Sequence, residues 1–404
     1  MTITAENKNF GVSKLSRLME ELERQAETRL DTVIDTRQLT IAPVRLPDET
    51  SYLGIYPNEG TQATEFLDKN NGLPFKPSSL KQFGSKMKPK VPSKFLTELA
   101  NVYPEIAGGM LDDLSYQLGK RLLIRQLDGK CRAVLSSRYR MLDHHDLVFQ
   151  ALNTAKEVNA KVVSCSLSDD FMRIKLICPQ LWMALDKGQG GHKFFTPGEL
   201  ANPEWKEKNG IHGELDSDAF EHDGEIVWPG CEISNSETGK GGTTIRPFLC
   251  DKACFNMSIY ETSARSVHLG GEMGAGIYTD ETISADSKAI MLKMRDSITA
   301  CFDRDKFKLI MSQRVEAASD VILAPSLAVD RVVENNIVPK SKRDQLLAYF
   351  LGDYTAGGSA NRGGLSQALS RMAQDEFDCG DQASVYEQAS GQMITAGRSI
   401  IGTA

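Results

Sequence analysis

Residues 120–140 read KRLLIRQLDGKCRAVLSSRYR, with the dipeptide Asp128-Gly129 in the middle of the stretch. One run rich in leucine and isoleucine precedes the dipeptide, and a second apolar run follows it. Two apolar runs joined by Asp-Gly are the strongest short-range signal for a tight β-hairpin. The stretch therefore predicts two antiparallel strands with basic side chains on them and just beyond them. Those side chains, together with a tyrosine, are Arg121, Arg125, Lys130, Arg132, Arg138, Tyr139 and Arg140.

The segments on both sides of this hairpin extend the pattern. The runs AKVVSCSLSD and DFMRIKLICP meet at Asp169-Asp170 and predict a second antiparallel hairpin in the same sheet, which residues 226–251 resume. Apolar residues recur at helical spacing over 12–30, and a helix with Asp143 as its cap is expected to follow the first hairpin. The predicted fold class is α+β: an antiparallel sheet with packed helices, an N-terminal amphipathic helix and a C-terminal helical region.

Composition shifts along the chain predict four parts. Residues 69–94 carry four prolines and two glycines without a helical or alternating period, which is typical of an extended loop or linker. Carboxylates dominate residues 199–225, which predicts an exposed acidic insertion. The expected parts are 1–68 with the N-terminal helix and short strands, 69–94 as a basic loop or linker, 95–325 as the α+β core with the acidic insertion 186–225, and 326–404 as the helical region.

The overall composition is that of an ordinary globular protein. The chain has 404 residues, 41% hydrophobic and 25% charged, which is enough apolar material for a core. No apolar run approaches the roughly 18 residues that cross a bilayer, and the first residues do not form a secretory signal. Eight scattered cysteines without such a signal are typical of reduced thiols. We therefore expect a cytoplasmic protein with no membrane partner.

The charge is unevenly distributed. The whole chain carries −7, but residues 69–140 contain fourteen basic residues against five acidic ones. Such a segment is typical of an anion-binding face, because lysine and arginine neutralise phosphates. The candidate nucleic-acid-binding residues are Lys86, Lys88, Lys90, Lys94 and the seven hairpin residues named above, with Tyr139 stacking on an unpaired base. The alternative is that Tyr139 closes the edge of a core while the arginines pair with carboxylates.

Recognisable catalytic chemistry is missing from the sequence. There is no GxxxxGK[ST], GxSxG or HExxH motif, and no strand is followed by GxGxxG. Cys250, Cys254 and His268 could supply three zinc ligands, but their spacing is irregular and a fourth ligand is not evident. The adjacent His144 and His145 favour a role in capping a helix over a catalytic pair. We therefore expect no catalytic residues, no metal site and no cofactor, and an enzyme with a site around Asn256 and His268 is the weakest alternative.

Several short motifs, taken in order, resemble the phage and plasmid proteins of domain-of-unknown-function family 932. The matching motifs are LSSRYRMLD at 135–143, EISNSETG at 232–239 with Asn235, CFNM at 254–257 with Cys254 and Asn256, RSVHLG at 265–270 with His268, and LSQALSRMA at 365–373. In the last motif Gln367 and Ser370 replace the Asn and Thr that are usual in the family. The resemblance implies a mobile-element protein of α+β fold, and a further analogy connects it to single-strand annealing proteins.

Together these observations predict a protein that binds single-stranded nucleic acid in replication or recombination, with strand annealing as an extension. Self-association into a homo-oligomer would lengthen the binding surface. The alternative, from a different class, is a non-enzymatic interaction or regulatory protein that engages a host protein through the acidic surface of residues 199–225. Binding by electrostatic attraction to phosphates would be sensitive to salt, whereas the alternative does not require nucleic acid at all.

Overall fold

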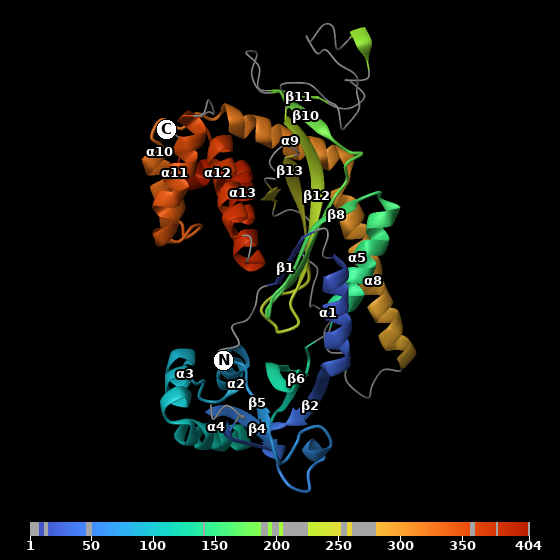
Figure 1. Cartoon of the computed structure of the whole chain (residues 1–404), viewed down its shortest axis with the longest axis vertical. Helices are drawn as coiled ribbons and strands as arrows, with labels where there is room; N and C mark the ends of the chain where they lie inside the picture. Colours follow the sequence, from blue (N-terminus) through green and yellow to red (C-terminus); the bar gives the residue numbers. More distant parts are fainter. Residues whose placement is uncertain are drawn as a thin grey trace.

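The structure is a computed structural model. It describes residues 8–11, 15–45, 51–139, 142–186, 193–195, 202–204, 225–251, 257–260, 280–355, 360–376 and 379–402. The fold is α+β, as predicted: the strands pair antiparallel in three sheets, and helices pack against them (Figure 1). The strands are β1 (Lys8–Gly11), β2 (Leu30–Asp35), β3 (Leu39–Arg45), β4 (Ser51–Pro57), β5 (Leu73–Pro74), β6 (Arg121–Leu127), β7 (Lys130–Ser136), β8 (Lys161–Leu167), β9 (Met172–Ile177), β10 (Met183–Asp186), β11 (Lys193–Phe195), β12 (Glu225–Asn235), β13 (Thr244–Asp251) and β14 (Met257–Ile259).

Helices are distributed over the whole chain. They are α1 (Leu15–Thr28), α2 (Pro77–Lys86), α3 (Ser93–Val102), α4 (Pro104–Leu118), α5 (His144–Glu157), α8 (Asp280–Cys301), α9 (Arg304–Ser319), α10 (Pro325–Glu334), α11 (Arg343–Thr355), α12 (Arg362–Asp375) and α13 (Gly380–Ile401), with short 3-10 turns at Thr36–Gln38, Gln62–Glu65 and Lys340–Lys342. Among the described residues, no helix is long and apolar enough to cross a membrane.

The predicted first hairpin is confirmed. Asp128 and Gly129 both adopt positive φ angles, 53° and 67°, which is the backbone that a two-residue hairpin turn requires. Strands β6 and β7 pair antiparallel, and β2 pairs with the other side of β6. The second hairpin, β8 and β9, is also confirmed, but the expectation that it shares a sheet with the first is wrong. It belongs to a separate eight-stranded sheet, because β12 and β1 flank it.

The first hairpin belongs to the lower part of the molecule in Figure 1, where two three-stranded sheets pack against α2, α3 and α4. Ile41, Ile55, Phe83 and Leu96 are buried in the shared core. The expectation that residues 69–94 form an extended loop is wrong over its middle, because α2 occupies Pro77–Lys86 and buries Leu80 and Phe83. The segment is therefore anchored to the core rather than a linker.

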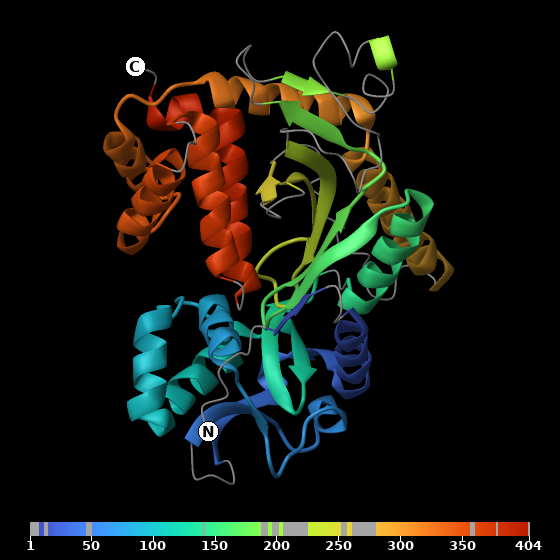
Figure 2. The same cartoon turned by 45° about the horizontal axis from the view of Figure 1, so that its top comes forward.

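The central sheet has the order β1-β8-β9-β12-β10-β11, and β13 and β14 extend it from β12. Helices α1, α5 and α8 cover one of its faces, and α12 and α13 lie on the opposite side (Figures 1 and 2). Alternation along the strands explains this arrangement: Ile174 and Leu176 join the core under α5, whereas Arg173 and Lys175 point to the other face and pair with α13.

The C-terminal region is helical, as predicted. Helices α10 to α13 surround a core that includes Val332, Phe350, Leu369 and Met393. The side chain of Asn361 accepts a hydrogen bond from the Gly364 N–H and caps α12. The acidic insertion lies largely outside the described residues: within 186–225, only residue 186, 193–195, 202–204 and residue 225 are described.

Candidate nucleic-acid interface

The eleven predicted nucleic-acid-binding residues differ in how far their side chains are exposed to solvent. Exposed side chains are Lys88, Lys90, Lys94, Arg121 and Arg138, while Lys86 and Lys130 are half-buried. Arg140 lies outside the described residues. Of the remaining three, Arg125 and Arg132 are buried and Tyr139 is half-buried, and all three contact carboxylates or backbone carbonyls.

The exposed lysines are concentrated at the junction of α2 and α3. We define the α2–α3 lysine surface by Lys81 and Lys86 of α2, Lys88 and Lys90 of the connection, and Lys94 of α3. None of these five lysines forms an ion pair with any residue that the structure describes. The side chains between them, Phe83, Met87, Val91 and Leu96, are buried, so the lysine surface rests on a fixed part of the core.

The prediction that Arg125 and Arg132 bind phosphate is wrong, because both side chains are buried and paired with carboxylates of the protein itself. Arg125 is only 1% exposed, and its guanidinium contacts Asp31 at 2.6 Å and donates to the Glu237 carbonyl at 2.9 Å. Arg132 contacts the Glu237 carboxylate at 2.8 Å. Asp31 lies directly opposite Arg125 in the β2–β6 ladder, where a pair of opposite charges is favourable.

Tyr139 does not present its ring for base stacking. Its ring packs against the small apolar cluster of Leu123, Ala133 and Leu135, and its hydroxyl donates to the Ser236 carbonyl at 2.9 Å. Burial raises the pKa of the hydroxyl to about 12. The alternative interpretation, in which Tyr139 closes a core edge and the arginines pair with carboxylates, is therefore confirmed for Tyr139, Arg125 and Arg132.

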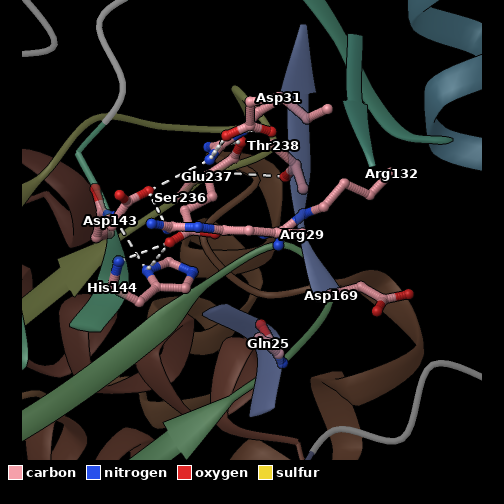
Figure 3. Close-up of polar contacts among 12 residues, drawn as sticks. Gln25, Arg29, Asp31, Arg132, Asp143, His144, Asp169, Ser236, Glu237 and Thr238 are labelled. Carbon is pink, nitrogen blue, oxygen red and sulfur yellow. Dashed lines mark hydrogen bonds and ion pairs between the residues drawn. The ribbon is translucent and has the colours of Figure 1, made fainter. Parts of the chain in front are cut away.

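These side chains belong to a cluster of charged groups between the lower part and the central sheet (Figure 3). We call it the buried ion-pair cluster, and its members come from the residue before β2, from β2, β6 and β7, from the start of α5, and from the end of β12 and the turn after it. They are Arg29, Asp31, Arg125, Arg132, Asp143, His144, Asn235 and Glu237.

Glu237 is the central acceptor of this cluster. Its carboxylate accepts from Arg132 and also from the His144 backbone N–H at 2.6 Å, so it caps the first turn of α5. Asp143 occupies the predicted N-cap position of α5, but its side chain forms no capping hydrogen bond and instead contacts Arg29 at 2.6 Å. Burial works against the charge of Glu237, but the neighbouring positive groups and the backbone hydrogen bond outweigh it and lower the pKa to about 2.

His144 and Asn235 form the polar end of the cluster nearest the central sheet. Burial and the nearby arginines lower the pKa of His144 to about 4, so the ring is neutral at pH 7. The Asn235 amide contacts His144 Nδ1 at 3.1 Å and donates to the Leu142 carbonyl at 2.9 Å, and its oxygen accepts from Thr243. Asn235, which the family motif singled out, thus holds the turn after β12 against α5.

The cluster does not provide a substrate-binding site. The cavity beside Arg132 and His144 has a volume of about 20 Å³, which accommodates little more than one water molecule. An ion pair between Lys76 and Asp169, 2.9 Å long, lies at the wall of this cavity. The arginines and carboxylates of the cluster pair with one another, and the cavity beside them has no room for a substrate. This arrangement indicates a structural connection between the lower part and the central sheet rather than acid–base catalysis.

The remaining family-motif and metal candidates are only partly described. Cys254, Asn256 and His268 lie outside the described residues, and Cys250 is a buried thiol. Among the residues that the structure describes, no group of three His, Cys, Asp or Glu side chains is arranged to hold a metal ion. The predicted zinc alternative therefore receives no support from the described part of the chain.

Two features of the site were missed by reasoning from the sequence. Glu237, which neutralises the hairpin arginines, is about 100 residues away from them in the chain, so no local pattern connects the two. Phe95, next to Lys94, is 50% exposed and is the aromatic side chain beside the lysine surface. The sequence contained a signal for Phe95, because Leu96 and Ala100 mark the buried face of α3 and Phe95 falls outside it.

Comparisons with models of known protein families, with curated proteins and with solved structures find no match for this chain. The resemblance to domain-of-unknown-function family 932 therefore stays a prediction.

Proposed function

We propose that this protein binds single-stranded nucleic acid through the α2–α3 lysine surface. The observation that carries the proposal is the set of five lysines at Lys81, Lys86, Lys88, Lys90 and Lys94, none of which has a carboxylate partner among the described residues. Lysines without internal partners are available to phosphates, and releasing the counterions of those phosphates supplies the binding free energy.

Phe95 supports a preference for single strands over duplex. Its half-exposed ring follows Lys94 directly on α3, so a base could stack on the ring while the lysine contacts the adjoining phosphate. Stacking requires an unpaired base, which a duplex does not offer. Phe95 takes the role that the sequence suggested for Tyr139, whose ring is packed against the β6–β7 hairpin.

The proposal extends to the cellular role inferred from the sequence. A protein that follows the backbone of single strands without reading their sequence suits replication or recombination, and annealing of two coated strands is the most specific form of that role. A phage or plasmid origin and a cytoplasmic location in a bacterial host belong to the same proposal. They rest on the motif resemblance and the composition, and the lysine surface stands independently of them.

The test is binding to a labelled single-stranded oligonucleotide at several salt concentrations. The triple variant Lys88→Ala, Lys90→Ala, Lys94→Ala should bind more weakly and reduce the slope of log K against log salt by about 2, since each single-strand phosphate contact contributes about 0.7. A matched control replaces three exposed lysines outside this surface, Lys161, Lys306 and Lys308, and should leave the slope unchanged.

Three further outcomes contradict the proposal. One is a wild-type protein that does not bind single strands at low salt. Another is an equal reduction of the slope of log K against log salt in the triple variant and in its matched control. Binding would then depend on the general charge of the protein rather than on the α2–α3 lysine surface. A third is that the wild-type protein binds duplex as tightly as single strands and that Phe95→Ala changes neither affinity.

A further inference from the structure

Two exposed apolar surfaces lie far apart on this protein. The first, which we call the α3–α4 corner, consists of Val102, Tyr103 and Ile106, with exposed fractions of 65%, 58% and 60%. These residues fall within five positions of the chain, where α3 ends and α4 begins, so their exposed side chains lie close together. Solvent-exposed apolar patches of this kind mark interaction sites in soluble proteins.

The second surface is a cavity of about 300 Å³ between the start of α10 and the end of α13. Ile322, Ala328 and Ile401 are buried in its floor, whereas Leu323 on its rim is 81% exposed. A cavity of this size can receive one or two apolar side chains but is at the lower limit for a small-molecule ligand.

The charges around the two surfaces are complementary. Arg331 lines the cavity and donates to the Ile401 carbonyl, but it forms no ion pair with any described residue. Arg398, in contrast, is neutralised by Glu316 and Asp320. At the α3–α4 corner the exposed carboxylates Glu98 and Glu105 also have no cationic partner among the described residues. One surface therefore offers a positive charge, and the other offers negative ones.

We propose that the α3–α4 corner of one copy docks into the α10–α13 cavity of a second copy. Within one molecule the two surfaces lie toward opposite ends of the longest axis, so a chain cannot cover its own cavity with its own corner (Figure 1). A contact between two different surfaces is heterologous, and it leaves one free corner and one free cavity on every dimer. Assembly therefore proceeds head to tail beyond two copies.

This inference goes beyond the proposed function and does not depend on it. The α2–α3 lysine surface lies at the start of α3, and the docking residues lie at its end. Variants that prevent docking should therefore keep their salt-dependent binding to single strands per copy. Failure of nucleic-acid binding would leave the assembly test unaffected.

The experiment uses two full-length variants, each lacking one of the two surfaces. Leu323→Asp removes the cavity rim and Ile106→Asp removes the corner, and both positions are exposed, so folding should be preserved. In sedimentation velocity, the wild type should form species larger than a dimer. Each variant alone should be monomeric, with association weakened at least about 100-fold by an unpaired charge at the contact. An equimolar mixture should form a dimer and nothing larger, because the one intact corner meets the one intact cavity.

The charge pairing is tested by Glu105→Arg and Arg331→Glu. Each should weaken association by up to about fivefold, and mixing the two should restore part of the loss, as for an exposed ion pair. The proposal is overturned by a wild type that stays monomeric at about 100 µM, well above the micromolar range of ordinary interfaces. It is also overturned if either aspartate variant still associates alone, if the wild type stops at a dimer, or if the mixture stays monomeric.

Discussion

The lysines of the α2–α3 surface and the arginines of the β6–β7 hairpin carry the same charge in one short segment of the chain, yet the fold uses them in opposite ways. The lysines project from a helix pair whose buried face lies on their other side, and they meet no carboxylate among the described residues. Arg125 and Arg132 lie on strands between Asp31 and Glu237 and lose contact with solvent. Charge density along a sequence therefore indicates an anion-binding surface only where no carboxylate lies across the fold.

The chemistry of the two side chains agrees with this division. A planar guanidinium donates several hydrogen bonds in fixed directions, and Arg125 uses this to join Asp31, Asp143 and the Glu237 carbonyl. A lysine ammonium is a strongly hydrated point charge on a flexible chain, which suits contacts that follow a phosphate backbone. Measurements of stability for the hairpin arginines and of salt-dependent binding for the lysines therefore separate the two roles.

The largest effect is expected from Glu237→Gln. The variant keeps the shape of the side chain but leaves Arg132 buried without its carboxylate, which should lower the free energy of unfolding by about 3–5 kcal/mol. Urea unfolding followed by circular dichroism at pH 7 measures this loss, with the exposed Glu20→Gln as the matched control. A loss no larger than that of the control would show that the cluster does not hold the lower part against the central sheet.

Acid should weaken the same cluster. The pKa of His144 is lowered from 6.5 to about 4 in the native state, so between these pH values the unfolded chain binds a proton that the native state does not. Stability should therefore fall as the pH drops from 6.5 toward 4, by on the order of 3 kcal/mol for this one group. Glu237, whose pKa is lowered from 4.5 to about 2, adds a further loss below pH 4.5.

The measurement is a series of urea unfolding curves between pH 7 and pH 4 for the wild type and for His144→Gln. Glutamine cannot gain a proton, so the variant should lose much less stability between pH 6.5 and pH 4.5 than the wild type. Parallel pH profiles for the two proteins would mean that other groups account for the acid sensitivity. Binding to single strands near pH 7 should be the same for both folded proteins, because His144 is not on the lysine surface.

The sequence predicted local structure well wherever the signal was local. Asp128-Gly129 identified the first hairpin because both residues tolerate the positive φ that its turn needs. The alternating runs around Asp169-Asp170 identified the second hairpin, whose strands β8 and β9 pair antiparallel. The linker expected at 69–94 failed because two of its four prolines lie at helix starts: Pro77 begins α2 and Pro92 is the N-cap of α3. Leu80 and Phe83 then bury one side of α2 in the core.

The candidate site was only partly predictable, because its decisive contacts are distant in the chain. The exposure of Lys88, Lys90 and Lys94 depends only on the local segment that carries them, so these lysines are still candidates for contacting phosphates. The burial of Arg125 depends on Asp31 in β2 and on the turn after β12, neither of which a window around the hairpin contains. Long-range pairing between strands is set by the tertiary fold, so a local pattern of arginines could not reveal which of them are neutralised.

The two aromatic residues extend the comparison to a smaller effect. Phe95→Ala should weaken single-strand binding by about 1–3 kcal/mol, the usual cost of losing one stacked base, with little change in the salt slope. Tyr139→Phe should leave binding unchanged and lower stability by about 1 kcal/mol, since only the hydrogen bond to the Ser236 carbonyl is lost. Fluorescence anisotropy and urea unfolding on both variants measure the two quantities. Because Tyr139→Phe keeps the ring, a binding defect in that variant would implicate the hydroxyl rather than stacking, whereas wild-type affinity in Phe95→Ala would remove Phe95 from the binding surface.

The smallest effect is expected at Arg138, the exposed arginine at the end of the hairpin. Its side chain is exposed, whereas Arg125 and Arg132 on the strands of the hairpin are buried. If the end of the hairpin continues the lysine surface, Arg138→Ala should reduce the salt slope by about 0.7, the value for a single phosphate contact on a single strand. Stability should change by less than about 0.5 kcal/mol, as for most surface substitutions. A salt slope identical to that of the wild type would restrict the binding surface to α2 and α3, and a large loss of stability would place Arg138 with the structural arginines instead.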